Sequence, residues 1–345
     1  MTLQQLLGIE LPIIQAPMAG VQGSALAIAV SNAGGLGSLP CAMLGLDAVR
    51  DELATIKART DRPFNVNFFC HAVPAPDGER DAAWRAELLP YYEEFGIDAG
   101  AIAAGPGRAP FGSAAADVLD EFRPPVVSFH FGLPAAALLA RVRASGAKIL
   151  CSATTVDEAR WLEAQGVDAV IAQGLEAGGH RGNFLADDPT AQAGTMALLP
   201  QIVRAVKVPV IAAGGIADAR GVAAAMALGA AGVQVGTAYL LCPEATTSAV
   251  HRAALKSEAS RHTALTNLFT GRPARGIVNR IIRERGPINA GVPAFPLATG
   301  AIAPLRARAE RLGSGDFSPL WSGQNATGCA EVPAAELTQA LAAGL

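Results

Sequence analysis

Short apolar runs alternate along most of the chain with segments in which apolar residues recur at helical spacing. The apolar runs predict strands at 12–18, 36–40, 64–69, 126–131, 148–153, 169–172, 209–213 and 232–237. The segments between them predict helices at 24–32, 47–60, 113–122, 134–145, 155–165, 195–206 and 219–228. Several strands are continuously apolar, which is typical of a parallel sheet covered on both faces. The pattern predicts an α/β protein with a closed (β/α)8 TIM barrel.

A doubly wound open sheet is the structural alternative. Such a sheet usually carries Gly-x-Gly-x-x-Gly after its first strand, and this sequence lacks that motif. The barrel is therefore the favoured fold.

The alternation of strands and helices is interrupted twice. A Pro-rich turn and a polar helix at 79–95 predict an insertion at about 70–100. Beyond residue 246 the sequence predicts helices at 247–258, 263–269 and 304–312, with a Gly- and Pro-rich stretch at 271–304 and a last helix at 334–343. We therefore expect a barrel over 1–245, a smaller, mostly helical C-terminal cap over 246–317, and a segment at 318–345 that returns to the barrel.

Composition and charge narrow the class of protein. Hydrophobic residues make up 51% of the chain, which is enough for a large core. The net charge is −3 and the Lys and Arg residues are scattered, so we expect no nucleic-acid partner. The sequence begins without a signal-peptide pattern and has no membrane-length apolar run, so we expect a cytoplasmic protein without membrane contact. The five cysteines and five histidines show no metal-ligand spacing, and we expect no metal.

Chemistry in a TIM barrel takes place at the carboxyl ends of the strands. The turns after the last two strands, Gly214-Gly215 and Gly236-Thr237, offer backbone N–H groups, a hydroxyl and a helix N-terminus to an anion. They predict the phosphate site of a cofactor, although ordinary strand–helix turns would also use glycine. Asn67, Gln173 and Gln234 are amides at strand ends, and an amide can both donate to and accept from a heteroaromatic ring. Satisfying buried backbone groups is the alternative role for these amides.

His180 is the candidate for acid–base chemistry. It lies in the glycine-rich loop 173–182 after the sixth strand, and imidazole is the side chain that exchanges a proton most easily near neutral pH. Glu176 is expected to orient this loop or to pair with Arg181. His130, at the end of the fourth strand, is a candidate for contact with the substrate. The remaining histidines, His71, His251 and His262, are expected on the surface or in the cap.

The sequence resembles the nitronate monooxygenases, formerly called 2-nitropropane dioxygenases, over essentially its whole length. The resemblance rests on the segments 12–20, 172–182, 212–216, 234–237 and 319–324, and its sharpest element is Glu176-Ala177-Gly178-Gly179-His180-Arg181-Gly182. The resemblance implies an enzyme that binds FMN non-covalently and acts on a small-molecule substrate. In that family the residue at the position of His180 takes the α-proton of a nitroalkane, and the nitronate is oxidised with O2. The residues that the resemblance assigns to FMN are Ala16, Pro17, Met18, Asn67, Gln173, Gly178, Gly179, Gly214, Gly215, Gln234, Val235, Gly236 and Thr237.

The cap departs from the best-defined class of this family. That class surrounds its substrate with tyrosines and a lysine, whereas segment 295–306 here contains neither. Two alternatives therefore stay open: an NAD(P)H-dependent flavin reductase of quinones or enoyl thioesters on the same barrel, and a non-catalytic flavin- or phosphate-binding barrel. A titratable His180 argues against the second alternative. The sequence leaves the oligomeric state open.

Overall fold

The computed structural model describes residues 1–102, 107–343 and 345. Its strands are β1 (Ile13–Gln15), β2 (Gly37–Pro40), β3 (Phe64–Phe69), β4 (Val126–His130), β5 (Lys148–Ala153), β6 (Ala169–Gln173), β7 (Gly179–His180), β8 (Val210–Ala213), β9 (Gly232–Val235), β10 (Thr263–Thr266) and β11 (Ala274–Ile277). The α-helices are α1 (Leu3–Leu7), α2 (Ser24–Asn32), α3 (Leu46–Arg59), α4 (Gly78–Phe95), α5 (Ser113–Phe122), α6 (Ala136–Ala144), α7 (Val156–Ala164), α8 (Thr195–Ala205), α9 (Ala219–Ala227), α10 (Ala249–Leu255), α11 (Arg280–Arg285), α12 (Thr299–Arg311) and α13 (Ala334–Ala342).

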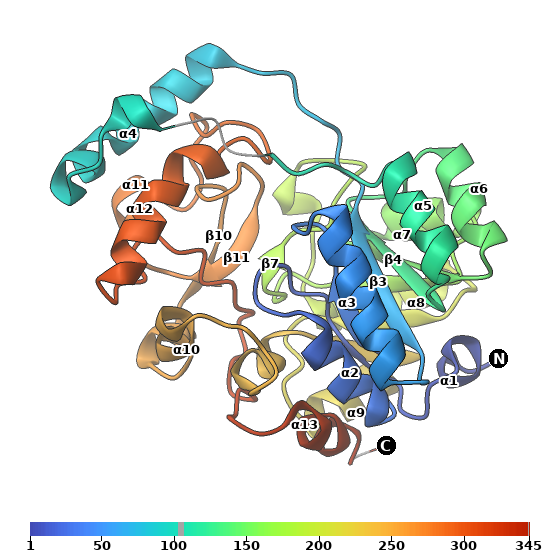
Figure 1. The fold of residues 1–345 in the computed structure, drawn as a ribbon. Coiled ribbons are helices and arrows are strands. Elements are labelled where there is room, and N and C mark those ends of the chain that lie inside the picture. Colours follow the sequence, from blue (N-terminus) through green and yellow to red (C-terminus); the bar gives the residue numbers. More distant parts are fainter. Residues whose placement is uncertain (103–106, 344) are drawn as a thin grey trace.

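Eight parallel strands form the barrel, in the order β1-β9-β8-β6-β5-β4-β3-β2. The two edge strands meet through a parallel bridge between Ile14 and Leu36. In this bridge the N–H of Gln15 donates to Leu36 O, and the N–H of Leu36 donates to Ile13 O, both over 2.9 Å. The predicted barrel is thus confirmed, with helices around it (Figure 1).

The barrel is filled and closed at the end opposite the active face. Inward-facing apolar residues of the strands, such as Ile14, Leu150 and Ile211, pack there against Leu3 and Leu7 of α1. The short helix α1 begins with a capping box in which Thr2 and Gln5 exchange hydrogen bonds. The sequence analysis did not predict α1, because five residues give too little periodicity to recognise a helix.

A second unit, the cap, lies beside the barrel mouth and contains a small antiparallel sheet ordered β10-β11-β7 (Figure 1). The predicted helix at 263–269 is wrong, since Thr263–Thr266 is strand β10 and pairs with β11. Helix α12 begins at Thr299, earlier than predicted, because Pro304 lies inside the helix and does not start it. Helix α11 and strands β7 and β11 were also not predicted.

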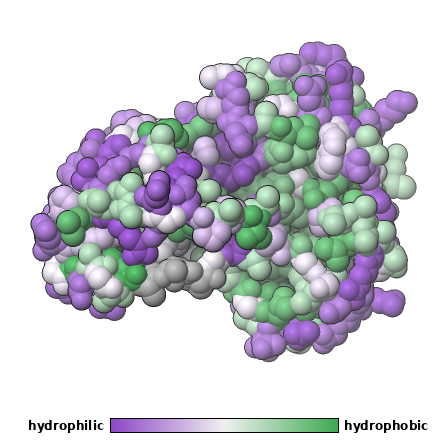
Figure 2. Space-filling view, turned by 90° about the horizontal axis from the view of Figure 1, so that it is seen from above, coloured by the Kyte–Doolittle hydropathy of each residue, from purple (hydrophilic) through white to green (hydrophobic). Residues whose placement is uncertain are grey.

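The segment at about 70–100 packs on the cap. Trp84, Leu88 and Tyr92 of α4 share a core with Leu305 of α12 and with Phe317. The Tyr92 hydroxyl donates to Ala301 O over 2.6 Å. Figure 1 shows α4 beside α11 and α12, while Figure 2 shows a largely hydrophilic cap surface next to the more mixed surface of the barrel. The residues inserted after β3 therefore contribute to the unit that covers the barrel mouth.

After Trp321 the chain runs back to the barrel, where α13 packs against α2 and α9. The Tyr239 hydroxyl and Thr338 Oγ1 lie 2.8 Å apart and join α13 to the segment that follows β9. Among the described residues, no helix combines the length and the apolar character that crossing a bilayer requires.

Candidate active site

A cavity of about 320 Å³ lies at the carboxyl ends of the barrel strands, between the barrel and the cap. Its wall includes the predicted residues Ala16, Pro17, Met18, Asn67, His130, Gln173, Gly178, Gly179, His180, Gly214, Gly215, Gln234, Gly236 and Thr237. Val235 is the exception, because its side chain is buried in the layer between strands and helices. Val235 acts on the site through its backbone: its carbonyl accepts from the N–H of Ala16, a residue of the cavity wall, over 2.8 Å.

The three strand-end amides have different roles. Gln173 supports the backbone of the loop, since its Nε2 donates to His180 O over 3.0 Å and its Oε1 accepts from the N–H of Gly182 over 2.8 Å. Asn67 Nδ2 donates to Ser128 Oγ over 2.9 Å. Gln234 Oε1 is buried and has no hydrogen-bond partner among the described residues.

The unpartnered Gln234 oxygen tests the expected cofactor. A buried acceptor without a donor costs about 1–3 kcal/mol. A flavin ring carries an N–H donor at its edge, so a ring in this cavity would satisfy the acceptor. The unpartnered oxygen of Gln234 therefore fits a flavin. Asn67 Nδ2 donates to both Ser128 O and Ser128 Oγ, so Asn67 offers a ring only its Oδ1, and Gln173 uses both ends of its amide on the loop.

The two predicted phosphate turns lie at the cavity. Gly214 and Gly215 have φ values of 117° and 74°, which glycine adopts without strain. Thr237 Oγ1 accepts from the N–H of Gly323 over 2.9 Å, which leaves its own hydroxyl hydrogen free to donate. The Asp218 side chain caps α9 by accepting from the N–H of Gly221 over 2.8 Å, so one N–H group of the expected helix N-terminus is already bound.

The segment 322–325 lies against both turns. Asn325 Nδ2 donates to Gly215 O over 3.1 Å, and the N–H of Gln324 donates to Glu176 O over 2.9 Å. A Cβ atom on Gly178 would lie 2.6 Å from Gly323 N. Gly178 is therefore required for packing against this segment, a reason that the sequence analysis did not find.

The His180 loop is anchored to both the barrel and the cap. His180 and Gly179 form strand β7, which pairs with Ala274 and Arg275 of β11 in the cap. Arg181 is 1% exposed and donates to Gly174 O, Gln173 O and Gln192 Oε1 over 2.6, 2.8 and 2.6 Å. Burial lowers the Arg181 pKa to about 10.

Glu176 was expected either to orient the loop or to pair with Arg181, and its contacts agree with the first of these roles. Its carboxylate accepts from the N–H and the hydroxyl of Thr195 over 2.8 and 2.9 Å. Arg181 binds the backbone carbonyls of the loop, which explains why this arginine needs no carboxylate partner.

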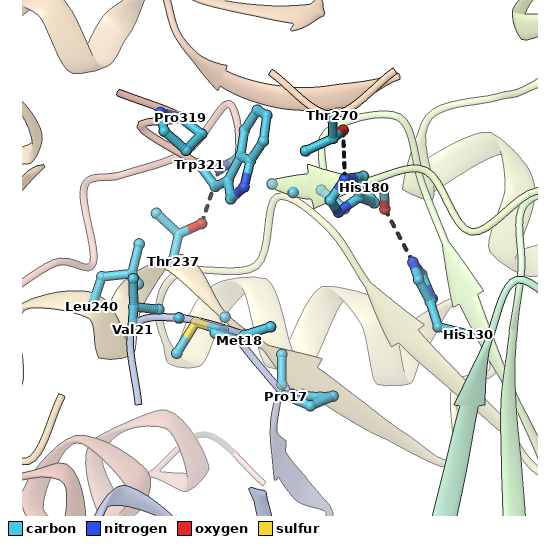
Figure 3. A pocket seen from close by; sticks show the side chains of 18 of the residues that line it. Pro17, Met18, Val21, His130, His180, Thr237, Leu240, Thr270, Pro319 and Trp321 are labelled. Atoms are coloured by element: carbon cyan, nitrogen blue, oxygen red, sulfur yellow. Dashed lines mark hydrogen bonds between the residues drawn. The ribbon is translucent and has the colours of Figure 1, made fainter. Parts of the chain in front are cut away.

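The His180 ring faces the cavity. Its Nε2 lies 2.9 Å from Thr270 Oγ1, and that hydroxyl has Arg272 O as its acceptor at 3.4 Å (Figure 3). With its hydroxyl hydrogen directed to Arg272 O, Thr270 can accept from Nε2–H, and the lone pair of that tautomer lies on Nδ1. The Nδ1 atom makes no hydrogen bond with the described residues and is not sealed from solvent.

Aromatic rings surround His180, with Phe295 and Trp321 at centroid distances of 5.3 and 5.6 Å. Burial, followed by the positive charges of Arg108 and then Arg272, holds the His180 pKa well below its usual range. The imidazole is therefore neutral at pH 7 and able to accept a proton.

His130 supports the loop from the barrel side. Burial lowers its pKa to about 3, so the ring is neutral. Its Nε2 lies 3.3 Å from His180 O, which can only accept (Figure 3). Its Nδ1 lies 2.6 Å from Ser152 Oγ. Nε2 therefore carries the proton and holds the His180 backbone. The ring also lines the cavity, where the sequence analysis expected it to meet the substrate.

Two histidines expected on the surface or in the cap are buried. His71 is 6% exposed, packs against Phe295 at 4.8 Å, and has its Nε2 3.0 Å from Arg108 O. His251 is 4% exposed, and its Nε2 lies 3.1 Å from Trp321 O. Both contacts join segments that are distant in sequence, so no local pattern indicated them. His262 is exposed, as expected.

Among the described residues, no group of three or more His, Cys, Asp or Glu side chains could hold a metal ion. A TIM barrel with two glycine-containing turns and strand-end amides around a cavity at its mouth has the features of the flavin-dependent oxidoreductases. A family profile described as nitronate monooxygenase matches residues 1–344. The nitronate monooxygenase of Pseudomonas aeruginosa is 43% identical over 98% of this chain and 97% of its own length. The chain belongs to the nitronate monooxygenase family.

Solved structures agree with this assignment. The nitroalkane oxidase from Streptomyces ansochromogenes superposes with a TM-score of 0.90 at 40% identity, covering 99% of this chain and 97% of that one. FabK from Thermotoga maritima superposes with a TM-score of 0.71 at 28% identity, covering 99% and 94% of the two chains. The fold and the family are thus established together.

Proposed function

We propose that the protein binds FMN and oxidises alkyl nitronates with O2 to a carbonyl compound and nitrite. The family is named for nitronate oxidation, and the structure resembles a nitroalkane oxidase. When bound, the flavin supplies the electron-transfer chemistry that a reaction with O2 requires. The turns at 214–215 and 236–237 would hold its phosphate, while Asn67 and Gln234 would bind its ring.

The observation that carries the proposal is the orientation of His180. Its Nε2 faces Thr270, and its Nδ1 is the nitrogen left open, so the neutral ring offers one lone pair for a proton. A base must lie within hydrogen-bonding reach of the proton that it removes. His180 would take the α-proton of a nitroalkane at Nδ1 and hold it there while the resulting nitronate is oxidised.

The depressed pKa of His180 favours one substrate form over the other. Burial and the nearby arginines keep the imidazole unprotonated but make it a weak base. A nitronate has already lost its α-proton and needs no base. We therefore propose that nitronates are the main substrates and that neutral nitroalkanes react slowly.

The side chains around His180 would keep water away from the reacting carbon. Phe69, Phe131, Phe295 and Trp321 all have ring centroids within contact distance of the imidazole. An apolar surrounding strengthens the electrostatic interactions inside the cavity.

Replacing His180 with Asn tests the role of the base. Loss of a general base lowers the rate by about 10²–10⁴-fold. We expect this loss in oxygen uptake with nitroethane, a much smaller effect with ethyl nitronate, and bound FMN in both proteins. Equal turnover of nitroethane by the variant would exclude His180 as the base.

Anaerobic mixing with NADH or NADPH tests the alternative reductase function. A nitronate oxidase needs no hydride donor, so the yellow colour of the flavin should persist. Rapid bleaching, together with no oxygen uptake on addition of ethyl nitronate, would favour the reductase.

A further inference from the structure

Arg108 differs from the other arginines near the cavity. It lines the wall, and its guanidinium carbon lies 5.6 Å from the centroid of the Phe295 ring. Among the described residues, its guanidinium has no carboxylate partner and no hydrogen-bond acceptor. A cation that is partly removed from water and unpaired is costly to keep, which suggests that a ligand provides the missing anion.

Neither of the other nearby arginines is available in this way. Arg306 also lines the cavity, but its Nε lies 2.8 Å from the Glu310 carboxylate. Arg272 does not line the cavity; it stacks on Phe131 at 4.2 Å and donates to the carbonyl of Asn183. Arg108 is thus the cavity-lining cation without a partner in the part of the chain that the structure describes.

The position of Arg108 relates it to His180. Both pack against Phe295, the imidazole at 5.3 Å and the guanidinium carbon at 5.6 Å from the centroid of that ring. His71 fixes the Arg108 backbone, because its Nε2 lies 3.0 Å from Arg108 O. Burial lowers the His71 pKa, so this ring is neutral and must use its Nε2–H to reach the carbonyl.

We infer that the Arg108 guanidinium is the receptor for the anionic head of the substrate and positions it beside His180. The inference rests on the proposed function for the identity of that anion, a nitronate. A nitronate head is planar with two oxygens that share one negative charge, which matches the fork of N–H donors on a guanidinium. The anion would also neutralise the positive charge that otherwise lies next to the imidazole.

Nitrate is a suitable probe, because it is planar, singly charged and does not react. We would titrate nitrate into the FMN-loaded protein by calorimetry in chloride-free buffer. Arg108→Met should weaken nitrate binding by about tenfold or more, the range expected for loss of a hydrogen bond to a charged group. The charge-neutral double variant Arg306→Met/Glu310→Gln, on the same cavity wall, should leave nitrate affinity within about twofold.

A pH profile separates an electrostatic role from a packing role. Arg108, Arg272, His130 and His71 all act on the His180 ring. Arg108→Met removes one positive charge, so the apparent pKa of His180 in nitroethane turnover should rise. Arg108→Lys keeps the charge and should leave that pKa unchanged. With ethyl nitronate, Arg108→Met should raise KM about ten- to a hundredfold and change kcat less.

These outcomes distinguish the inference from the function on which it rests. Nitrate binding that is lost in Arg108→Met supports the anion receptor even if the wild-type protein oxidises no nitronate. Nitrate binding that is equal in wild type and Arg108→Met would overturn the inference, whatever the turnover. An unchanged KM and pKa in a variant that retains its FMN would overturn it as well.

Discussion

Arg181 offers the sharpest test of how the His180 loop is held. Its guanidinium is buried and makes three hydrogen bonds of 2.6–2.8 Å to Gly174 O, Gln173 O and Gln192 Oε1. Replacing it with methionine keeps most of the apolar stem and removes every donor. Gln173 O and the half-buried Gln192 Oε1 would then lose this donor, while Gly174 O would keep the N–H of Ala177 at 3.1 Å.

The cost can be worked out from these contacts. Each unsatisfied buried acceptor costs about 1–3 kcal/mol, but the variant no longer has to bury a charge, which offsets part of the loss. We expect Arg181→Met to lower the free energy of unfolding by about 2–4 kcal/mol, from the two acceptors that lose a donor. For a chain of this length that corresponds to a melting temperature lower by about 3–6 °C.

Differential scanning fluorimetry of the FMN-loaded and flavin-free proteins measures this shift. Arg252 is a matched control, because its guanidinium is likewise bound by backbone carbonyls but lies away from the loop. Its four acceptors are the carbonyls of Thr247, Leu241, Cys242 and Ala245. Arg252→Met should destabilise the fold without changing the nitroethane-to-nitronate rate ratio, whereas Arg181→Met should change both. A shift below about 2 °C for Arg181→Met would refute the reasoning.

Two further predictions address segment 322–325, which contacts the two turns, and the dependence of stability on pH. Gly178→Ala places a Cβ 2.6 Å from Gly323 N, so segment 322–325 must move, and we expect flavin affinity, measured by fluorescence titration, to fall about tenfold. Gly78→Ala is the control, because its Cβ meets no atom within 4 Å and its backbone has no positive φ, and it should leave the affinity unchanged. His251 has its pKa lowered to about 4, mainly by burial. As the pH falls, His251 is therefore protonated in the unfolded chain before it is protonated in the folded protein. The free energy of unfolding falls by about 1.4 kcal/mol per pH unit between about pH 6.5 and 4. His251→Gln should reduce the drop in melting temperature between pH 7 and 4.5, and an identical drop would contradict this.

The barrel could be predicted because its strands are buried on both faces. Val210–Ala213 is a continuous apolar run, Ala169–Gln173 is one up to its last residue, and each is followed by a helix with an apolar face. The cap sheet has no such signal. Strand β7 has only two residues, and its partner β11 lies far along the sequence in the cap, so no local pattern connects the two.

The part of the candidate site that could be predicted is the part with a local sequence pattern. Glycines at strand ends and a histidine between glycines pointed to Gly214, Gly215 and His180, which the fold brings to one cavity. Arg108 reaches the same cavity from the segment that follows β3, His71 contacts its backbone carbonyl, and both side chains pack on Phe295 of the cap. Such contacts depend on tertiary packing, so no spacing in the sequence indicates them.

The contacts of segment 322–325 have a consequence for the biosynthesis of the protein. The cavity wall combines Ala16, made early, with Asn325, which bonds to Gly215 and is made more than three hundred residues later. A nascent chain can form the barrel strands before the ribosome reaches Gly323, but the phosphate turns then lack their supports. If these turns bind the cofactor as proposed, the complete site exists only after synthesis has passed residue 325, and a chain that ends earlier lacks the contacts of Gly323 and Asn325.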